Sequence, residues 1–193
     1  MSGTLDRREA VAALLSNRGD LLVVTGLGSP TYDVFAQGDA DGNYYLWGAM
    51  GSAALIGLGL AQAQPQRTVV VITGDGEQLM GLGGLATIGI AKPKNLVIVV
   101  LDNGHYGETG MQRSHAGLGL ELADVAEACG LAAHTLYEMS EVRALQADLR
   151  APADGPRFYG IKVRAENLAR AMPSRDAILI KNRFRRYLGL TVS

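Results

Sequence analysis

Two runs of apolar, mostly β-branched residues constrain the fold of this chain more than any other feature. Residues 69–73 read VVVIT and residues 95–101 read NLVIVVL, and neither run carries a charge. Runs of this length and composition predict strands that are buried on both faces. Such strands are typical of a parallel sheet covered by helices, because half-exposed antiparallel strands alternate polar and apolar residues.

Helical and extended patterns alternate along the rest of the chain. We predict strands at residues 20–26, 69–73, 95–101, 133–137 and 157–163. Predicted helices cover residues 5–16, a stretch from about 50, about 81–91, 121–128 with Gly130 as C-cap, 140–149 and 174–188. Residues 27–43 and 105–119 are predicted to be loops, the first because it clusters Gly, Pro and Asp. The alternation indicates an α/β fold with a doubly wound, mostly parallel sheet and helices on both faces.

Composition narrows the class of protein. We expect residues 1–193 to form a single domain, which is long enough to bury a substantial core. A net charge of −1 and no basic run longer than RFRR argue against a nucleic-acid partner. Cys129 has no second cysteine to pair with, and the N-terminus shows no signal-peptide pattern, so we expect a cytoplasmic protein.

The longest nearly uncharged run, at residues 44–61, approaches the roughly 20 residues that a membrane-spanning helix needs. It contains closely spaced glycines and lacks flanking basic anchors. We therefore predict a closely packed internal helix here and no membrane association.

The chemistry-bearing motif is the sequence Gly74-Asp75-Gly76, which follows the strand at residues 69–73 and is predicted to form a turn. A G-x-G-x-x-G/A dinucleotide motif would need Gly or Ala at position 79, where the chain has Leu79, and no P-loop pattern occurs. Asp75 would repel a phosphate unless a cation lay between them, and Mg²⁺ commonly bridges carboxylates and phosphates. A nucleotide-binding oxidoreductase domain nevertheless stays open as a second interpretation.

A second oxygen ligand follows the next strand, in the sequence Asp102-Asn103-Gly104. One helix and one strand separate it from Asp75, which is the content of a βαβ crossover. Because such crossovers bring the carboxyl ends of both strands to one edge of the sheet, we expect the two loops to be adjacent. The sequence therefore predicts a magnesium site at this edge.

Residues 74–104, GDGEQLMGLGGLATIGIAKPKNLVIVVLDNG, resemble the G-D-G…N-N signature of the pyrophosphate domain of thiamine-diphosphate enzymes. The resemblance implies thiamine diphosphate and Mg²⁺ as cofactors. It implies Asp75, Asn103 and the backbone carbonyl of His105 as metal ligands, with the N–H groups of Gly76 and Glu77 facing the diphosphate. Asp102 departs from the pattern, since the family has Asn at the first position of the pair.

Upstream, residues 44–61 resemble the family segment that receives the aminopyrimidine. This implies that the Gly48 carbonyl accepts from the 4′-amino group and that Met50 wedges the cofactor into a bent conformation. The complete set of predicted cofactor-binding residues is Gly28, Ser29, Gly48, Met50, Gly74, Asp75, Gly76, Glu77, Asn103, His105 and Tyr106.

The loop after the metal motif supplies the candidates for catalysis. They are His105, Glu108, Thr109 and Gln112. Arg113 is a candidate for pairing with an anionic tail of the substrate, because guanidinium groups bind such tails in bidentate fashion.

The chain length and the sequence HYGETGMQ most resemble the small subunit of sulfopyruvate and phosphonopyruvate decarboxylases. Those members often read G-x-Q-P-T where this chain reads GMQRS, so the identity of the 2-oxo acid stays open. The resemblance implies an activating glutamate on a pyrimidine-binding domain. The residues before the first strand are too few to hold that domain, so we expect it on an alpha subunit in a hetero-oligomer. An acetolactate-synthase-like carboligase and a noncatalytic interaction protein also stay open as functions.

Overall fold

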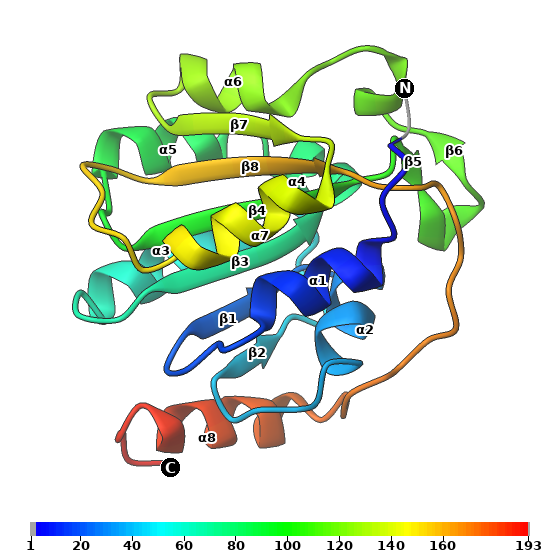
Figure 1. Cartoon of the computed structure of the whole chain (residues 1–193). Helices are drawn as coiled ribbons and strands as arrows, with labels where there is room; N and C mark the ends of the chain where they lie inside the picture. Colours follow the sequence, from blue (N-terminus) through cyan, green and yellow to red (C-terminus); the bar gives the residue numbers. More distant parts are fainter. Residues whose placement is uncertain (1–2, 193) are drawn as a thin grey trace.

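A sheet of six strands lies at the centre of the computed structural model, which describes residues 3–192 (Figure 1). Its order is β2-β1-β3-β4-β8-β7, and every neighbouring pair is parallel. The strands are β1 (Leu22–Thr25), β2 (Asn43–Tyr45), β3 (Val69–Gly74), β4 (Leu96–Asp102), β7 (Ala132–Leu136) and β8 (Arg157–Lys162). The two apolar runs of the sequence form β3 and β4, side by side in the interior, which confirms the predicted α/β class.

Helices cover both faces of this sheet (Figure 1). One hydrophobic cluster includes α1 (Arg7–Leu15), α2 (Ser29–Phe35) and α7 (Met139–Asp148). The other includes α3 (Ala53–Ala63), α5 (Gly84–Ala91) and α6 (Leu122–Ala128). Successive strand residues point to opposite faces, so Val70 and Ile72 belong to the first cluster, and Val69 and Val71 to the second. The sheet is therefore doubly wound, as predicted.

The C-terminal part of the chain runs from β8, near one edge of the sheet, to β2 at the opposite edge. After β8, residues 164–176 run along the outside of the molecule to α8 (Ala177–Tyr187), which lies against the edge strand β2 (Figure 1). Phe184 of α8 packs edge-on against Tyr44, with 5.5 Å between the ring centroids. The predicted basic C-terminal helix is confirmed, and it covers an otherwise open sheet edge.

The prediction of a loop over residues 27–43 is wrong, because this segment contains α2 and the first residue of β2. Gly28 is the N-cap of α2 with φ of 69°, and Pro30 lies in its first turn. Gly and Pro mark helix starts as well as turns, and here they start a short helix whose Val34 is buried.

The predicted turn at Gly74-Asp75-Gly76 is also wrong. Gly74 is both the last residue of β3 and the N-cap of α4 (Asp75–Met80), which begins at once. The single helix predicted at about 81–91 is preceded by this extra one, and α5 starts only at Gly84. Acidic residues favour the first turn of a helix, which suits Asp75 and Glu77 in α4.

The segment predicted as a loop after β4 holds short elements. They are β5 (His105–Tyr106), η1 (Gly107–Thr109), β6 (Gln112–Arg113) and η2 (Ala116–Leu118). Strands β5 and β6 pair in antiparallel fashion, so this segment is a small hairpin beyond the carboxyl end of β4.

Within residues 3–192 no helix has the length and apolar character needed to cross a membrane. The uncharged run at residues 44–61 is divided between the end of β2, a turn and most of α3.

The strand order places a switch point between β1 and β3. The chain moves from β1 to β2 on one side, and then returns to add β3 on the other side. In open α/β sheets ligands bind in the crevice at the carboxyl ends of the strands beside such a point.

Candidate cofactor site

A cavity of about 190 Å³ lies at this switch point. Its walls come from the segments that follow β1, β3 and β4, together with residues of α1, of the turn before α3 and of the end of β8. The lining residues are Arg7, Leu27, Ser29, Pro30, Met50, Gly74, Asp75, Gly76, Glu77, Leu101, Asn103, His105, Tyr106, Gly107, Glu108, Thr109 and Val163. Most residues predicted from sequence to bind cofactor or to assist catalysis therefore meet around one cavity.

Three of the residues predicted to bind the cofactor or to assist catalysis do not line this cavity. Gly28 lies just behind it, where an added Cβ would come within 2.8 Å of the Glu108 side chain. Gly48 is exposed, with no heavy atom within 4 Å of the position of a Cβ. Gln112 is exposed and donates to the backbone carbonyl of Thr109 at 2.9 Å, so it shapes the hairpin.

Asp75 is the first residue of α4, and only 2% of its surface is exposed. Its Oδ2 accepts a hydrogen bond of 2.5 Å from the hydroxyl of Ser114, a residue that the sequence analysis missed. Burial raises the pKa of the Asp75 carboxyl to about 6, although the Ser114 hydrogen bond opposes the rise. No basic side chain of residues 3–192 forms an ion pair with this carboxylate.

Asn103 follows β4 and is held in a tight turn. Its Oδ1 accepts from the backbone N–H of His105 at 2.9 Å, and its backbone oxygen lies 2.8 Å from Nδ1 of the same histidine. The preceding residue, Asp102, accepts from the N–H of Gly104 at 2.9 Å. These bonds fix the direction of the Asn103 side chain at the cavity.

Asp102 is held in turn by a buried lysine. Nζ of Lys162, in β8, lies 2.7 Å from Oδ2 of Asp102 and 3.0 Å from Oε2 of Glu121. Burial acts to lower the pKa of the Lys162 ammonium, but its bonds to both carboxylates outweigh burial and raise that pKa. The ion pair explains how the chain accommodates an acid where the family pattern has Asn.

Glu77 connects α4 to the segment after β1. Its Oε2 accepts from the backbone N–H of Leu27 at 2.6 Å, while Oε1 has no hydrogen-bond partner within residues 3–192. An added Cβ at Gly26 would lie 2.2 Å from Oε2, so this contact requires glycine there. The expectation for Glu77 concerned its backbone N–H, and the role of its side chain was missed.

Arg113 does not reach the cavity. Its guanidinium donates to the backbone carbonyl of Gly117, and the residue is exposed in β6. The arginine that lines the cavity is Arg7, which was not among the site residues predicted from the sequence.

The donors around the cavity fit a hard cation and a phosphate ligand. The Asp75 carboxylate and the Asn103 amide both line it, and oxygen donors of this kind suit Mg²⁺. Residues 3–192 contain no group of three His, Cys, Asp or Glu side chains that could hold a metal. Of the predicted metal ligands only Asp75 binds through a side chain of these four types, so the absence of such a group neither supports nor contradicts the predicted magnesium site.

Comparisons with known proteins agree with this arrangement. Residues 32–163 match the family model described as thiamine pyrophosphate enzyme, C-terminal TPP binding domain. The chain is 38% identical to the sulfopyruvate decarboxylase subunit beta of Methanothermobacter thermautotrophicus, over 93% of this chain and 94% of that one. It is 39% identical to the same subunit from Methanocaldococcus jannaschii, over 70% of this chain and 72% of that one.

The chain belongs to the thiamine pyrophosphate enzymes and contains their TPP-binding domain. Phosphonopyruvate decarboxylase of Streptomyces viridochromogenes is a further relative, 41% identical over 77% of this chain but only 37% of its own length. The relatives confirm the predicted enzyme class, a thiamine-diphosphate-dependent decarboxylase. The fold also matches the thiamine diphosphate-dependent 4-hydroxybenzoylformate decarboxylase of Rhodococcus jostii, with a TM-score of 0.71, 20% identity and coverage of 86% of this chain and 34% of that chain.

Proposed function

We propose that this chain is the thiamine-diphosphate- and Mg²⁺-binding subunit of a heteromeric 2-oxo acid decarboxylase. The observation that carries the proposal is the meeting of Asp75 and Asn103 at one cavity, at the switch point of a sheet that belongs to this family. Asp75, Asn103 and the carbonyl of His105 would hold the metal. Bound thiamine diphosphate would supply a thiazolium ring that accepts electrons when the carboxylate carbon is lost.

The residues of the chain have separate tasks in this proposal. Glu77 holds the segment after β1 against α4 through its bond to Leu27, so Ser29 stays at the cavity wall. Met50 enters the cavity from the turn before α3, where a bent cofactor would rest on it. His105 and Glu108 also line the cavity, and they are the side chains that we propose move protons on the substrate.

The substrate class is a small 2-oxo acid with an acidic tail. Support comes from relatives whose names specify sulfopyruvate and phosphonopyruvate decarboxylation. A carboligase of the acetolactate-synthase type would use the same cavity. Product analysis separates the two activities, since a carboligase joins a second carbonyl compound and a decarboxylase releases an aldehyde.

The partner that we propose is a pyrimidine-domain alpha subunit, which would bring the activating glutamate. Two relatives carry the name subunit beta at nearly this length, and the phosphonopyruvate relative is much longer than the matched region. We further propose that residues 1–193 form one domain and act in the cytoplasm.

An exposed apolar surface beside the cavity is where we place this partner. It consists of Met50, Leu55 and Met80, which are 38%, 40% and 64% exposed. Glycines bring these residues together, because a Cβ at Gly81 would lie 2.0 Å from the Gly51 carbonyl and one at Gly84 would lie 3.1 Å from Leu55. Exposed apolar side chains that are gathered in one place commonly mark protein interfaces.

Thermal unfolding of the chain, with thiamine diphosphate and Mg²⁺ together and singly, tests the cofactor proposal. At about 100 times the dissociation constant, binding adds roughly 2.7 kcal/mol, which raises the Tm by about 5–11 °C for a chain of this size. Asp75→Ala should lose this rise. Asp124→Ala removes an exposed carboxylate of α6 and should keep it. An equal rise in the absence of metal, or in Asp75→Ala, would contradict the magnesium site.

Decarboxylation of sulfopyruvate and phosphonopyruvate tests the heteromeric proposal. The chain alone should release no carbon dioxide, and addition of a pyrimidine-domain subunit should restore turnover. Robust turnover by the pure chain would refute the need for a partner.

A further inference from the structure

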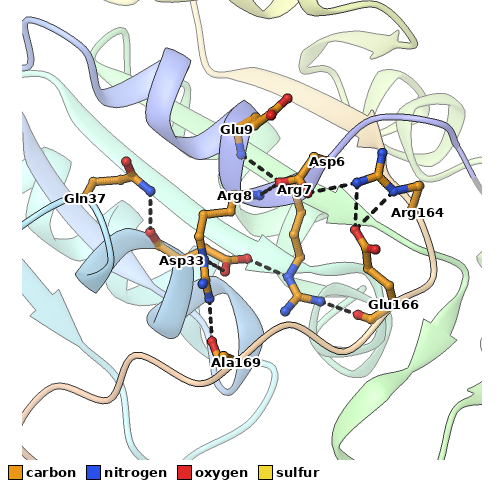
Figure 2. A network of polar contacts seen from close by, with 9 residues as sticks. All are labelled: Asp6, Arg7, Arg8, Glu9, Asp33, Gln37, Arg164, Glu166 and Ala169. Atoms are coloured by element: carbon orange, nitrogen blue, oxygen red, sulfur yellow. Dashed lines mark hydrogen bonds and ion pairs between the residues drawn. The ribbon is translucent and has the colours of Figure 1, made fainter.

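Two adjacent arginines meet one buried carboxylate beside the cavity (Figure 2). Asp33 of α2 is fully buried, and it accepts from Nε of Arg7 at 2.6 Å and from Nε of Arg8 at 3.0 Å. Each arginine also donates to the C-terminal segment, Arg7 to the carbonyl of Glu166 at 2.7 Å and Arg8 to that of Ala169 at 2.8 Å. These contacts join α1, α2 and residues 164–176.

The two arginines differ in what they face. Arg7 is 4% exposed and lines the cavity, whereas the Arg8 side chain is 28% exposed and does not line it. Nε and Nη1 of Arg7 are engaged by Asp33 and Glu166, which fixes the plane of its guanidinium. Within residues 3–192 its Nη2 forms no hydrogen bond, so two N–H donors are left for something else.

The charges around Arg7 also leave a need for an anion. Asp33 is the only carboxylate of residues 3–192 that is paired with Arg7 or Arg8, so these three side chains together carry a net positive charge. The nearby carboxylates of Asp6 and Glu166 are engaged by Arg164 (Figure 2).

A planar guanidinium whose plane is fixed and whose Nη2 donors are free matches the oxygens of a tetrahedral oxyanion. Arg7 is also the one permanently cationic side chain among the described residues that line the cavity. An oxyanion in the cavity would give its free donors their acceptor.

We infer that Arg7 is the anion-binding residue of the cavity and that its Nη2 donates to a phosphate-, phosphonate- or sulfonate-type oxyanion of the bound ligand. The inference rests on the proposed function for the nature of the ligand. Two sources share this chemistry, the diphosphate of the cofactor and the acidic tail of the substrate. Asp33 and the Glu166 carbonyl hold the guanidinium in place, and Arg8 shares the charge of Asp33 without touching the ligand.

Calorimetric titration of the chain with four probes tests the inference and distinguishes the sources. The probes are thiamine diphosphate with Mg²⁺, pyrophosphate with Mg²⁺, methylphosphonate and methanesulfonate. Arg7→Gln should weaken binding of at least one probe by about 10- to 100-fold, as expected for loss of a charge-assisted hydrogen bond. Arg8→Gln is the matched control, since it removes the other arginine from Asp33, and it should change every affinity less than threefold.

The pattern of loss identifies the oxyanion. Loss toward thiamine diphosphate and pyrophosphate assigns Arg7 to the cofactor, whereas loss only toward phosphonate or sulfonate assigns it to the substrate. Unchanged affinity of Arg7→Gln for every probe that the wild type binds would overturn the inference, as would an equal loss in Arg8→Gln. Failure of the wild type to bind thiamine diphosphate would instead count against the proposed function.

Two measurements keep the inference testable if Arg7→Gln does not fold. Arg7→Lys keeps a cation for Asp33 but lacks the planar fork, and it should show the same selective loss. In the wild type, the Nε–H resonance of Arg7 in a ¹H–¹⁵N spectrum should shift when the responsible probe is added. If none of the four probes shifts this resonance, the contact is refuted.

Discussion

Replacement of Lys162 by Met tests how the turn that carries Asn103 is held. The Lys162 side chain is only 6% exposed, and its Nζ lies between Asp102, at 2.7 Å, and Glu121, at 3.0 Å. Methionine has a similar length but no charge. The Asp102 carboxylate, whose side chain is 4% exposed, would then be buried without a cation, whereas Glu121 is 29% exposed and keeps access to water.

The expected cost follows from this burial. Removal of one partner of a buried ion pair typically costs about 3–5 kcal/mol, because the other charge is left uncompensated. At about 2–4 °C per kcal/mol for a domain of this size, the Tm of Lys162→Met should fall by roughly 6–20 °C. Urea unfolding at pH 7 measures the free-energy difference directly.

The pH dependence has a defined sign. The pKa of Lys162 is raised in the folded protein, so its stabilising effect is complete below the unfolded value of about 10.4 and is lost as the pH rises through the folded value. The stability difference between wild type and Lys162→Met should therefore be constant from pH 7 to 9 and shrink only above about pH 10.4.

A double-mutant cycle separates the ion pair from packing. Asp102→Asn keeps an oxygen acceptor for the N–H of Gly104 and removes the charge. The double variant Asp102→Asn/Lys162→Met should be more stable than Lys162→Met alone. A loss below about 1 kcal/mol in Lys162→Met, or a strictly additive cycle, would refute the argument that this lysine neutralises a buried acid.

Three glycine substitutions have further expected outcomes. In Gly89→Ala the new Cβ would lie 1.7 Å from the backbone oxygen of Cys129, so urea unfolding should show a free energy of unfolding lower by about 1–3 kcal/mol or more. In the control Gly59→Ala nothing lies within 4 Å of the new Cβ, so the free energy of unfolding should rise by about 0.5–1 kcal/mol. Equal effects of the two substitutions would contradict the packing argument. In Gly76→Ala the Cβ would lie 2.6 Å from the ring of Tyr106, so titration should show weaker binding of thiamine diphosphate with Mg²⁺. Unchanged affinity would mean that the ring moves freely.

The buried strands were the part of the fold that the sequence predicted best. β3 extends one residue beyond the predicted 69–73, and β4 fills 96–102, because continuous apolar runs have few other places in a protein of this size. The errors in the predicted elements occur where Gly and Pro are compatible both with a turn and with the start of a helix. At Gly28 and Gly74 the glycine begins a helix directly, and no turn of the expected kind is present.

Some residues of the site could likewise be predicted from the sequence, and others could not. Asp75 and Asn103 were predictable, because a polar side chain directly after a buried strand is placed by the strand itself. Ser114, Lys162 and Arg7 were not, since their partners lie 39, 60 and 26 residues away along the chain. A lysine that ends a strand or an arginine that begins a helix commonly faces solvent. Only the tertiary structure shows that these two do not.

The four buried carboxylates of residues 3–192 show why the cavity needs a cation from outside the chain. Asp33 and Asp102 are each paired with basic side chains and do not line the cavity. Asp75 and Glu77 line the cavity, and neither is paired with a base. Their nearest compensation is neutral, from the Ser114 hydroxyl and the Leu27 N–H.

A diphosphate that entered this cavity without a metal would meet the unpaired carboxylates of Asp75 and Glu77, and the single charge of Arg7 would not offset both. Its charge would add to a site that burial already makes unfavourable for anions, as the raised pKa of Asp75 indicates. A divalent cation between the carboxylate and the phosphates reverses the sign of this interaction. Within the described residues the chain provides basic partners for the buried acids Asp33 and Asp102 and none for Asp75, and that difference is the electrostatic basis for placing the metal at Asp75.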